Sequence, residues 1–173
     1  MKALSKKEAK KLFKEIPARE REIVLMLENI QYARNVAGIF RTADAAGVNK
    51  MYLTGISQHP PFGKEMKQVS RSKEKSVHWE MVEKDKLPKL IEKMKGFGYY
   101  FVALEIADEG QPIENLPKLL KGKDKVVIVA GSEVFGLTKA TISMCDAAVY
   151  IPMYGRGGSL NVTASVAIAL YSF

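Results

Sequence analysis

Two short apolar runs near the C-terminal end limit the folds that this chain can adopt. Val126–Ala130 and Ala147–Ile151 are continuously hydrophobic, and each passes into a glycine-bearing loop. Runs of this length are typical of strands buried on both faces, as in a parallel sheet covered by helices. In an open α/β sheet, ligands bind beyond the carboxyl ends of the strands. The polar segments that follow the two runs, Gly131–Glu133 and Gly155–Asn161, are therefore the predicted site.

The rest of the chain alternates between strand and helix patterns, which predicts an α/β fold with a mostly parallel sheet flanked by helices. Strands are expected at 23–27, 51–53, 77–82 and 99–104. Helices are expected at 33–46, where Gly47 is placed as the cap, at 86–95, and at 160–170, which Ser159 opens, with a possible turn of helix within 113–120. Residues 54–76 contain glycine and two adjacent prolines and are expected to form a long loop, a feature that tends to be functional.

The first 21 residues are interpreted as a basic helical extension that precedes one domain at 22–173. Ser5 and Glu8 have the spacing of a capping box, and Leu12, Phe13 and Ile16 recur at helical intervals. Residues 1–22 hold eight Lys or Arg against four Glu. The extension is thus either an arm for a nucleic-acid backbone or a helix with an ordinary solvated face.

Charge points to the class of partner. The 173 residues carry 27 Lys and Arg against 19 Asp and Glu, a net charge of +8, which favours a polyanion such as nucleic acid, although solubility alone would also explain it. Backbone contacts are expected from the basic segment after residue 54 and from the glycine-rich loop. The candidates are Lys64, Lys67, Arg71, Lys73 and Arg156.

Several classes of protein are disfavoured by what the chain contains. A single cysteine, Cys145, excludes an intrachain disulfide, and two histidines are too few for a zinc cluster. No apolar run approaches the roughly 20 residues of a membrane helix, and the Lys-rich N-terminus does not resemble a secretory signal. We therefore expect a cytoplasmic protein with neither a metal nor a membrane span.

The glycine-bearing loops fail the tests for common nucleotide sites. Leu137 occupies the position after the second glycine where a P-loop has lysine. Gly155–Gly158 lacks the third glycine of the dinucleotide fingerprint, and Ser159 has no G-x-S-x-G elbow. We therefore expect no ATP or NAD site and no hydrolase triad.

Four segments resemble, in order and separation, the three motifs of the SpoU/TrmH RNA ribose methyltransferases of the SPOUT class. They are Asn35–Ala43, Gly131–Leu137, Ile151–Met153 and Ser159–Val162. The resemblance extends from about Glu22 to the C-terminus. Ser132 and Val134 depart from it, because the family usually has Asn and often Gly beside the glutamate that corresponds to Glu133.

The resemblance implies a SPOUT fold with a C-terminal deep trefoil knot, a homodimer packed through the knot region, and methylation of a ribose 2′-hydroxyl in tRNA or rRNA. The implied cofactor is S-adenosyl-L-methionine, held largely by backbone groups at Leu104, Gly131, Ser132, Ile151, Met153 and Leu160. The implied catalytic residues are Arg41, Asn35, Glu133, Ser159 and Asn161. Arg41 is the residue assigned to activating the hydroxyl, either in its own site or in that of the other subunit. A guanidinium is not deprotonated in proteins, so a phosphate beside the hydroxyl is interpreted as sharing the role of proton acceptor.

Two other functions stay open at this point. One is a non-catalytic RNA-binding protein that retains the fold, against which the completeness of the motifs argues. The other is a methyltransferase for a small molecule or a protein. Substrate binding by the latter would depend little on salt, whereas RNA binding weakens steeply as salt is added.

Overall fold

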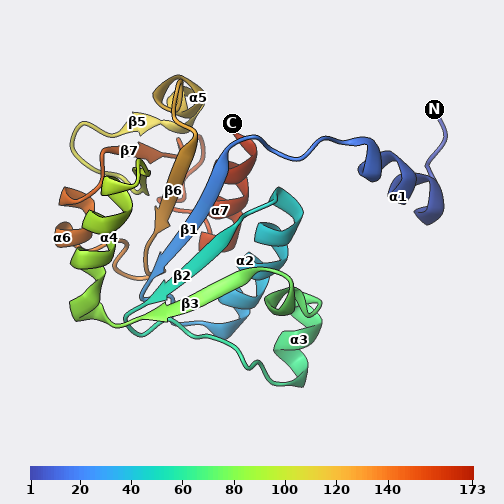
Figure 1. The fold of residues 1–173 in the computed structure, drawn as a ribbon, viewed down its shortest axis with the longest axis horizontal. Coiled ribbons are helices and arrows are strands. Elements are labelled where there is room, and N and C mark those ends of the chain that lie inside the picture. The colour runs from blue at the N-terminus through green and yellow to red at the C-terminus, as the bar shows by residue number, and fades with distance from the viewer.

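The computed structural model describes residues 1–173 and shows a seven-stranded parallel sheet between two layers of helices (Figure 1). The strand order is β3-β2-β1-β6-β4-β7-β5, and every neighbouring pair is parallel. The predicted parallel α/β sheet is therefore confirmed. The strands are β1 (Glu22–Glu28), β2 (Lys50–Thr54), β3 (His78–Val82), β4 (Tyr100–Leu104), β5 (Gln111–Pro112), β6 (Lys125–Ala130) and β7 (Ala147–Tyr150).

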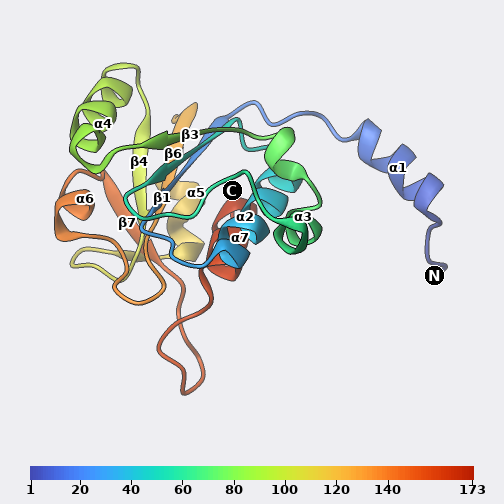
Figure 2. The same ribbon diagram turned by 90° about the horizontal axis from the view of Figure 1, so that it is seen from below.

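Helices cover both faces of the sheet, as Figures 1 and 2 show. One layer contains α2 (Ala33–Ala46), α3 (Lys64–Ser70) and α7 (Val162–Tyr171), and the other contains α4 (Leu87–Gly96) and α6 (Lys139–Ser143). The short helix α5 (Leu116–Leu119) precedes β6. Single 3-10 turns lie at Lys73–Lys75 (η1), Lys84–Lys86 (η2) and Ile113–Asn115 (η3).

The double covering explains why the central strands are continuously apolar. Along β1, Ile23, Leu25 and Leu27 belong to the core beneath α2 and α7, whereas Val24 and Met26 belong to the core beneath α4. Successive side chains of a strand point to opposite faces, so burial of both faces favours apolar residues at every interior position of the strand.

Helix α2 begins and ends where the sequence predicts. Gly47 follows it with φ of 72°, and its amide donates to the carbonyls of Ala43 and Asp44. A left-handed residue of this kind is the commonest way to end a helix, and glycine adopts the conformation without strain.

The expected long loop over residues 54–76 is wrong. This segment contains helix α3 and the turn η1. Met66 and Val69 of α3 pack against the core, while Lys64 and Lys67 are exposed. The segment therefore contains a short amphipathic helix. The glycine and prolines that precede it obscure the helical spacing of its apolar residues in the sequence.

The N-terminal helix α1 (Lys6–Glu15) stands apart from the body of the molecule (Figure 1). Both hydrogen bonds of the predicted capping box form: the Ser5 amide donates to the Glu8 carboxylate at 2.7 Å, and the Glu8 amide donates to Ser5 Oγ at 3.3 Å. None of its residues is buried. Its helical state thus rests on local interactions, without tertiary packing.

Neither a membrane-spanning helix nor a metal-binding cluster occurs among residues 1–173. No helix has the length and apolar character of a membrane span. No group of three His, Cys, Asp or Glu side chains is placed to hold a metal ion.

Candidate functional site

A pocket of about 400 Å³ opens at the carboxyl ends of three neighbouring strands. Leu104 of β4, Ala130 of β6 and Tyr150 of β7 are the last residues of their strands, and all three lie in its wall. Parallel strands end at the same edge of the sheet, which brings the loops that follow them together. The pocket therefore lies at the edge where the sequence places the site.

The structure brings all six expected cofactor-binding residues into this one pocket. They are Leu104, Gly131, Ser132, Ile151, Met153 and Leu160. Two of the expected catalytic residues, Glu133 and Ser159, line it as well. These residues come from the end of β4 and from the loops that follow β6 and β7.

A tight turn of residues 131–137 forms one wall of the pocket. The Ser132 amide donates to the Gly136 carbonyl at 3.0 Å, and the Gly136 amide donates to the Ser132 carbonyl at 2.9 Å. A Cβ atom at Gly131 would overlap the backbone of Gly136 and Leu137, so only glycine fits there. Ser132 Oγ accepts from the Val134 amide at 3.2 Å. Ser132, which departs from the family pattern, thus has a structural role, since its hydroxyl orders the turn.

Three of the expected catalytic residues join in one chain of hydrogen bonds. Asn35 Nδ2 donates to Glu133 at 2.6 Å, and Asn161 Nδ2 donates to Asn35 Oδ1 at 3.0 Å. Glu133 also accepts from the Gln31 amide at 3.3 Å, next to the start of α2. This end of α2 has no side-chain cap of its own, and a helix N-terminus favours a carboxylate. Glu133 is therefore an anchored, half-buried group and not a free acid on a surface loop.

Arg41 does not join this network within one chain. Its side chain is exposed, forms no hydrogen bond or ion pair, and does not line the pocket. Asn35 and Arg41 are six residues apart on α2, so their side chains point about 120° apart around the helix axis. The predicted orientation of Arg41 away from the core is thus observed. The space left by Gly38 on the same stripe is filled by Thr163 of α7, whose Cγ2 would lie 3.0 Å from an added Cβ atom.

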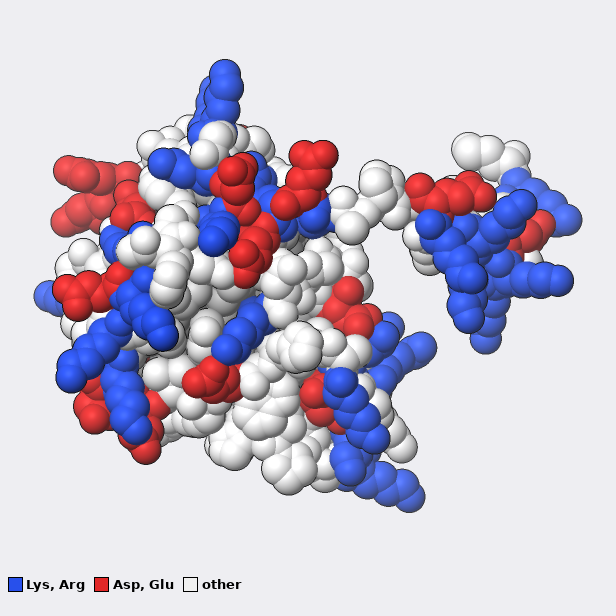
Figure 3. Space-filling model, viewed as in Figure 1, with Lys and Arg blue, Asp and Glu red and all other residues white.

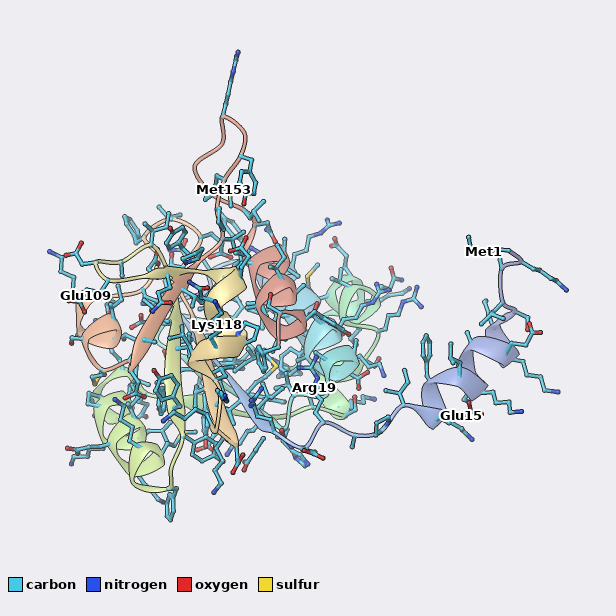
Figure 4. The ribbon with its side chains drawn as sticks, turned by 90° about the horizontal axis from the view of Figure 1, so that it is seen from above. Met1, Glu15, Arg19, Glu109, Lys118 and Met153 are labelled. Atoms are coloured by element: carbon cyan, nitrogen blue, oxygen red, sulfur yellow. The ribbon has the colours of Figure 1, made fainter.

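The expected helix start at Ser159 is wrong. Helix α7 begins at Val162, and its N-cap is Asn161, whose side chain accepts from the Thr163 amide at 2.9 Å. Ser159 lies before the helix, in an exposed loop that projects from the body (Figures 2 and 4). The Asn161 side chain both caps α7 and donates a hydrogen bond to Asn35.

The expected RNA-binding residues fall into three groups. Lys64, Lys67 and Arg71 are exposed at α3, at the lower right of Figure 3, and form no ion pair. Arg156 is exposed in the projecting loop. Lys73 differs, because its Nζ lies 2.7 Å from the Asp44 carboxylate. Burial opposes ionisation of Asp44, but hydrogen bonds from Lys73 and Ser76 outweigh it and lower its pKa.

Two carboxylates at this end of the sheet are not singled out by the sequence. Glu28 is buried and accepts from the Thr138 amide at 2.9 Å and from Thr141 Oγ1 at 2.8 Å, which ties the end of β1 to the start of α6. Glu105 lines the pocket. Glu28 ends an apolar strand and Glu105 directly follows one. That position is the only signal in the sequence that marks these two residues.

Residues 22–171 match the SpoU rRNA Methylase family. Over 167 residues the chain is 29% identical to the tRNA (guanosine(18)-2′-O)-methyltransferase of Aquifex aeolicus, covering 95% of this chain and 74% of that protein. It is 29% identical over 150 residues to the 23S rRNA (guanosine(2553)-2′-O)-methyltransferase RlmP of Bacillus subtilis, covering 86% of this chain and 56% of that protein. The chain thus spans little more than half the length of the second relative.

Solved structures agree with the sequence comparison. The A. aeolicus TrmH/SpoU tRNA modifying enzyme superposes with a TM-score of 0.76 at 27% identity, covering 96% of this chain and 80% of that one. The AdoMet-bound rRNA methyltransferase from Sinorhizobium meliloti also has a TM-score of 0.76, at 25% identity, covering 91% of this chain and 57% of that one. Because the family matches residues 22–171 and the solved structures share the fold, this chain belongs to the SpoU rRNA Methylase family.

Proposed function

We propose that this protein transfers a methyl group from S-adenosylmethionine to a ribose 2′-hydroxyl of tRNA or rRNA. The observation that carries the proposal is the network of Asn35, Glu133 and Asn161 beside the pocket. These residues come from three distant parts of the chain, and each belongs to a different one of the three family motifs. The two relatives described above are named for this reaction, one on tRNA and one on 23S rRNA.

The pocket fits the cofactor that the family implies. Its volume of about 400 Å³ lies in the range of roughly 300 to 1,000 Å³ that is typical of small-molecule sites. Leu104, Ile151 and Leu160 offer apolar walls, and Gly131 also lines the pocket. No Lys, Arg or His lines the pocket, so it does not suit the phosphates of ATP or NAD. When bound, S-adenosylmethionine supplies a methyl group carried on a sulfonium.

The residues of the network hold the reacting groups in place. Glu133 orients the side-chain amide of Asn35, and Asn35 in turn orients the side-chain amide of Asn161. Holding a nucleophile in line with its electrophile supplies a large part of such a rate enhancement. The 2′-hydroxyl must also lose its proton. We assign to Arg41 the positioning of the hydroxyl and of a neighbouring phosphate, which accepts the proton, because a guanidinium donates hydrogen bonds and does not accept them.

Arg41 needs a second copy of the chain to reach a site. It lies apart from the network in its own chain, so the site of one subunit lacks this residue unless a partner supplies it. Helix α7 supports such a partner, since Ala164, Ile168 and Tyr171 form an exposed apolar stripe along it. A surface helix of a monomer does not need apolar residues on its outer side. We therefore include a homodimer that packs through α7 in the proposal.

The RNA is expected to lie across α3 and the projecting loop. Lys64, Lys67, Arg71 and Arg156 are exposed cations without acidic partners, which is what contacts with a phosphate backbone require. Residues 1–21 are proposed as a separate extension of the domain. A cytoplasmic location, where both RNA classes are found, stays a prediction.

A methyl-transfer assay tests the proposed function. The protein is incubated with S-adenosylmethionine labelled in its methyl group and with total RNA that lacks modifications, and digested nucleosides are separated. We expect label in a 2′-O-methylnucleoside. Label in no RNA, together with salt-sensitive RNA binding, would identify a non-catalytic RNA-binding protein. Label only in protein or in a small molecule would contradict the proposed substrate.

A further inference from the structure

The pocket is locally acidic although the protein is strongly basic. Glu105 and Glu133 line it, and no Lys, Arg or His does. The whole chain nevertheless has 27 Lys and Arg against 19 Asp and Glu. A cleft lined by charges of one sign focuses its field on the ligand. The lining therefore favours a ligand that carries positive charge.

Glu105 is the carboxylate of this pair that the proposed catalytic network does not use. One of its oxygens accepts from the Ile106 amide at 3.0 Å, and the other accepts from the Leu137 amide at 2.9 Å. An ionised carboxylate is an acceptor at both oxygens, so two amide donors match the charged form. The two bonds also join the loop after β4 to the loop after β6.

The neighbouring turn is shaped to admit this carboxylate. Gly136 has φ of 65°, and a Cβ atom there would overlap Glu105 Oε2. Glycine at this position satisfies both the left-handed backbone and the space that the carboxylate occupies. The negative charge is thus held at a defined place in the wall and does not move freely with a flexible side chain.

From this geometry we infer that Glu105 makes the pocket discriminate by charge between the methyl donor and its demethylated product. This inference rests on the proposed function. In the transfer, the bond from sulfur to the methyl carbon breaks, its electron pair stays on sulfur, and the methyl group forms a bond to the 2′-oxygen, whose proton goes to an acceptor. The sulfonium becomes a neutral thioether. The pocket therefore loses an electrostatic attraction when the reaction is complete, which favours release of the product.

Isothermal calorimetry on the full-length protein tests the inference without any methyl transfer. Dissociation constants are measured for S-adenosylmethionine and for S-adenosylhomocysteine with the wild type, with Glu105→Gln and with Glu114→Gln. Glu114 is the matched control, since it is exposed, makes no hydrogen bond or ion pair and does not line the pocket. We expect Glu105→Gln to weaken the sulfonium ligand about tenfold, which corresponds to about 1.4 kcal/mol, and the thioether ligand less than about twofold. The control should change neither.

A salt titration of the wild type gives a second test that does not depend on the variant. Added salt should weaken the sulfonium ligand more than the thioether ligand, because only the first carries the extra charge. Equal weakening of both ligands by Glu105→Gln, or an equal effect of salt on both ligands, would overturn the inference. A wild type that binds neither ligand would instead contradict the proposed function.

Discussion

Arg41 is the single residue on which the proposed chemistry depends most. The guanidinium is exposed and without a partner in its own chain, so its removal should change the free energy of unfolding by less than about 0.5 kcal/mol. If it acts on the hydroxyl only in the transition state, Arg41→Ala should abolish turnover while the affinity for S-adenosylmethionine stays nearly unchanged. Single-turnover methylation of a verified RNA and calorimetry with the cofactor measure the two quantities.

Arg34→Ala is the matched control, because Arg34 is also exposed on α2 and forms no ion pair. Arg41→Lys should restore only part of the activity, since a point charge does not reproduce the planar fork of donors. A near-normal rate for Arg41→Ala would remove the catalytic role.

Cys145 gives the protein a predicted sensitivity to alkaline pH. Burial raises the pKa of its thiol from 9.0 to about 12. Above pH 9 the thiol ionises in the unfolded chain but not in the folded one, so its contribution to stability is complete below pH 9 and is lost as the pH rises toward 12. Urea unfolding at pH 8 and at pH 10.5 should therefore show a larger loss of stability for the wild type than for Cys145→Ala.

Tyr99 changes stability in the same direction, since burial and Glu22 raise its pKa to about 12, but it is present in both proteins and cancels from the comparison. Equal losses in the wild type and in Cys145→Ala would show that the thiol is not protected. The same protection predicts slow reaction of Cys145 with thiol reagents at pH 8, because the thiolate is the reactive form.

Among the secondary-structure elements, α1 is the one that the fold does not need. Its lysines Lys7, Lys10, Lys11 and Lys14 recur at helical spacing on one side, and no residue of the helix is buried. Deletion of residues 1–16 should therefore change the free energy of unfolding by less than about 0.5 kcal/mol. If α1 binds RNA, the deletion should also lower the slope of log K against log salt by about 0.7 to 0.9 for each phosphate that α1 neutralises.

A full-length variant with these four lysines changed to alanine separates charge from the presence of the helix. It should reproduce the lower slope if phosphate binding by the lysines is the cause. An unchanged slope in both proteins would show that α1 is an ordinary solvated helix.

The proposed dimer is a property of the whole molecule, and it depends on the exposed apolar stripe of α7. Ile168 is 37% exposed in the middle of the apolar stripe of α7, so Ile168→Glu places a charge where the proposed partner packs. We expect light scattering to report a dimer for the wild type and a monomer of 19.2 kDa for this variant. Methyl transfer should fall with the dimer, because Arg41 no longer reaches the second site.

Lys89→Glu on α4 is the control, since Lys89 is exposed and α4 covers the face of the sheet opposite to α7 (Figures 1 and 2). A wild type that stays monomeric at micromolar concentrations would contradict the proposed assembly. The trefoil knot implied by the family resemblance is likewise a property of the whole chain and stays a prediction.

Local pattern is enough to predict most elements of this protein and the edge of the sheet that carries the site. Strand β1, helix α2 with Gly47, and the capping box of α1 depend on residues close in sequence, so periodicity and spacing reveal them. The motif segments likewise identify Asn35, Glu133 and Asn161 before any contact between them is known.

Other features arise only when distant loops meet in the folded chain. Asn161 caps α7 and also donates to Asn35 at 3.0 Å, and Glu105 is held in the pocket wall by the amide of Leu137. Met66 and Val69 pack α3 against the core, although the turn residues before it predict a loop. Each of these outcomes depends on a partner far away in sequence, and hydrogen bonding and burial with such partners are properties of the tertiary structure, which local spacing does not encode.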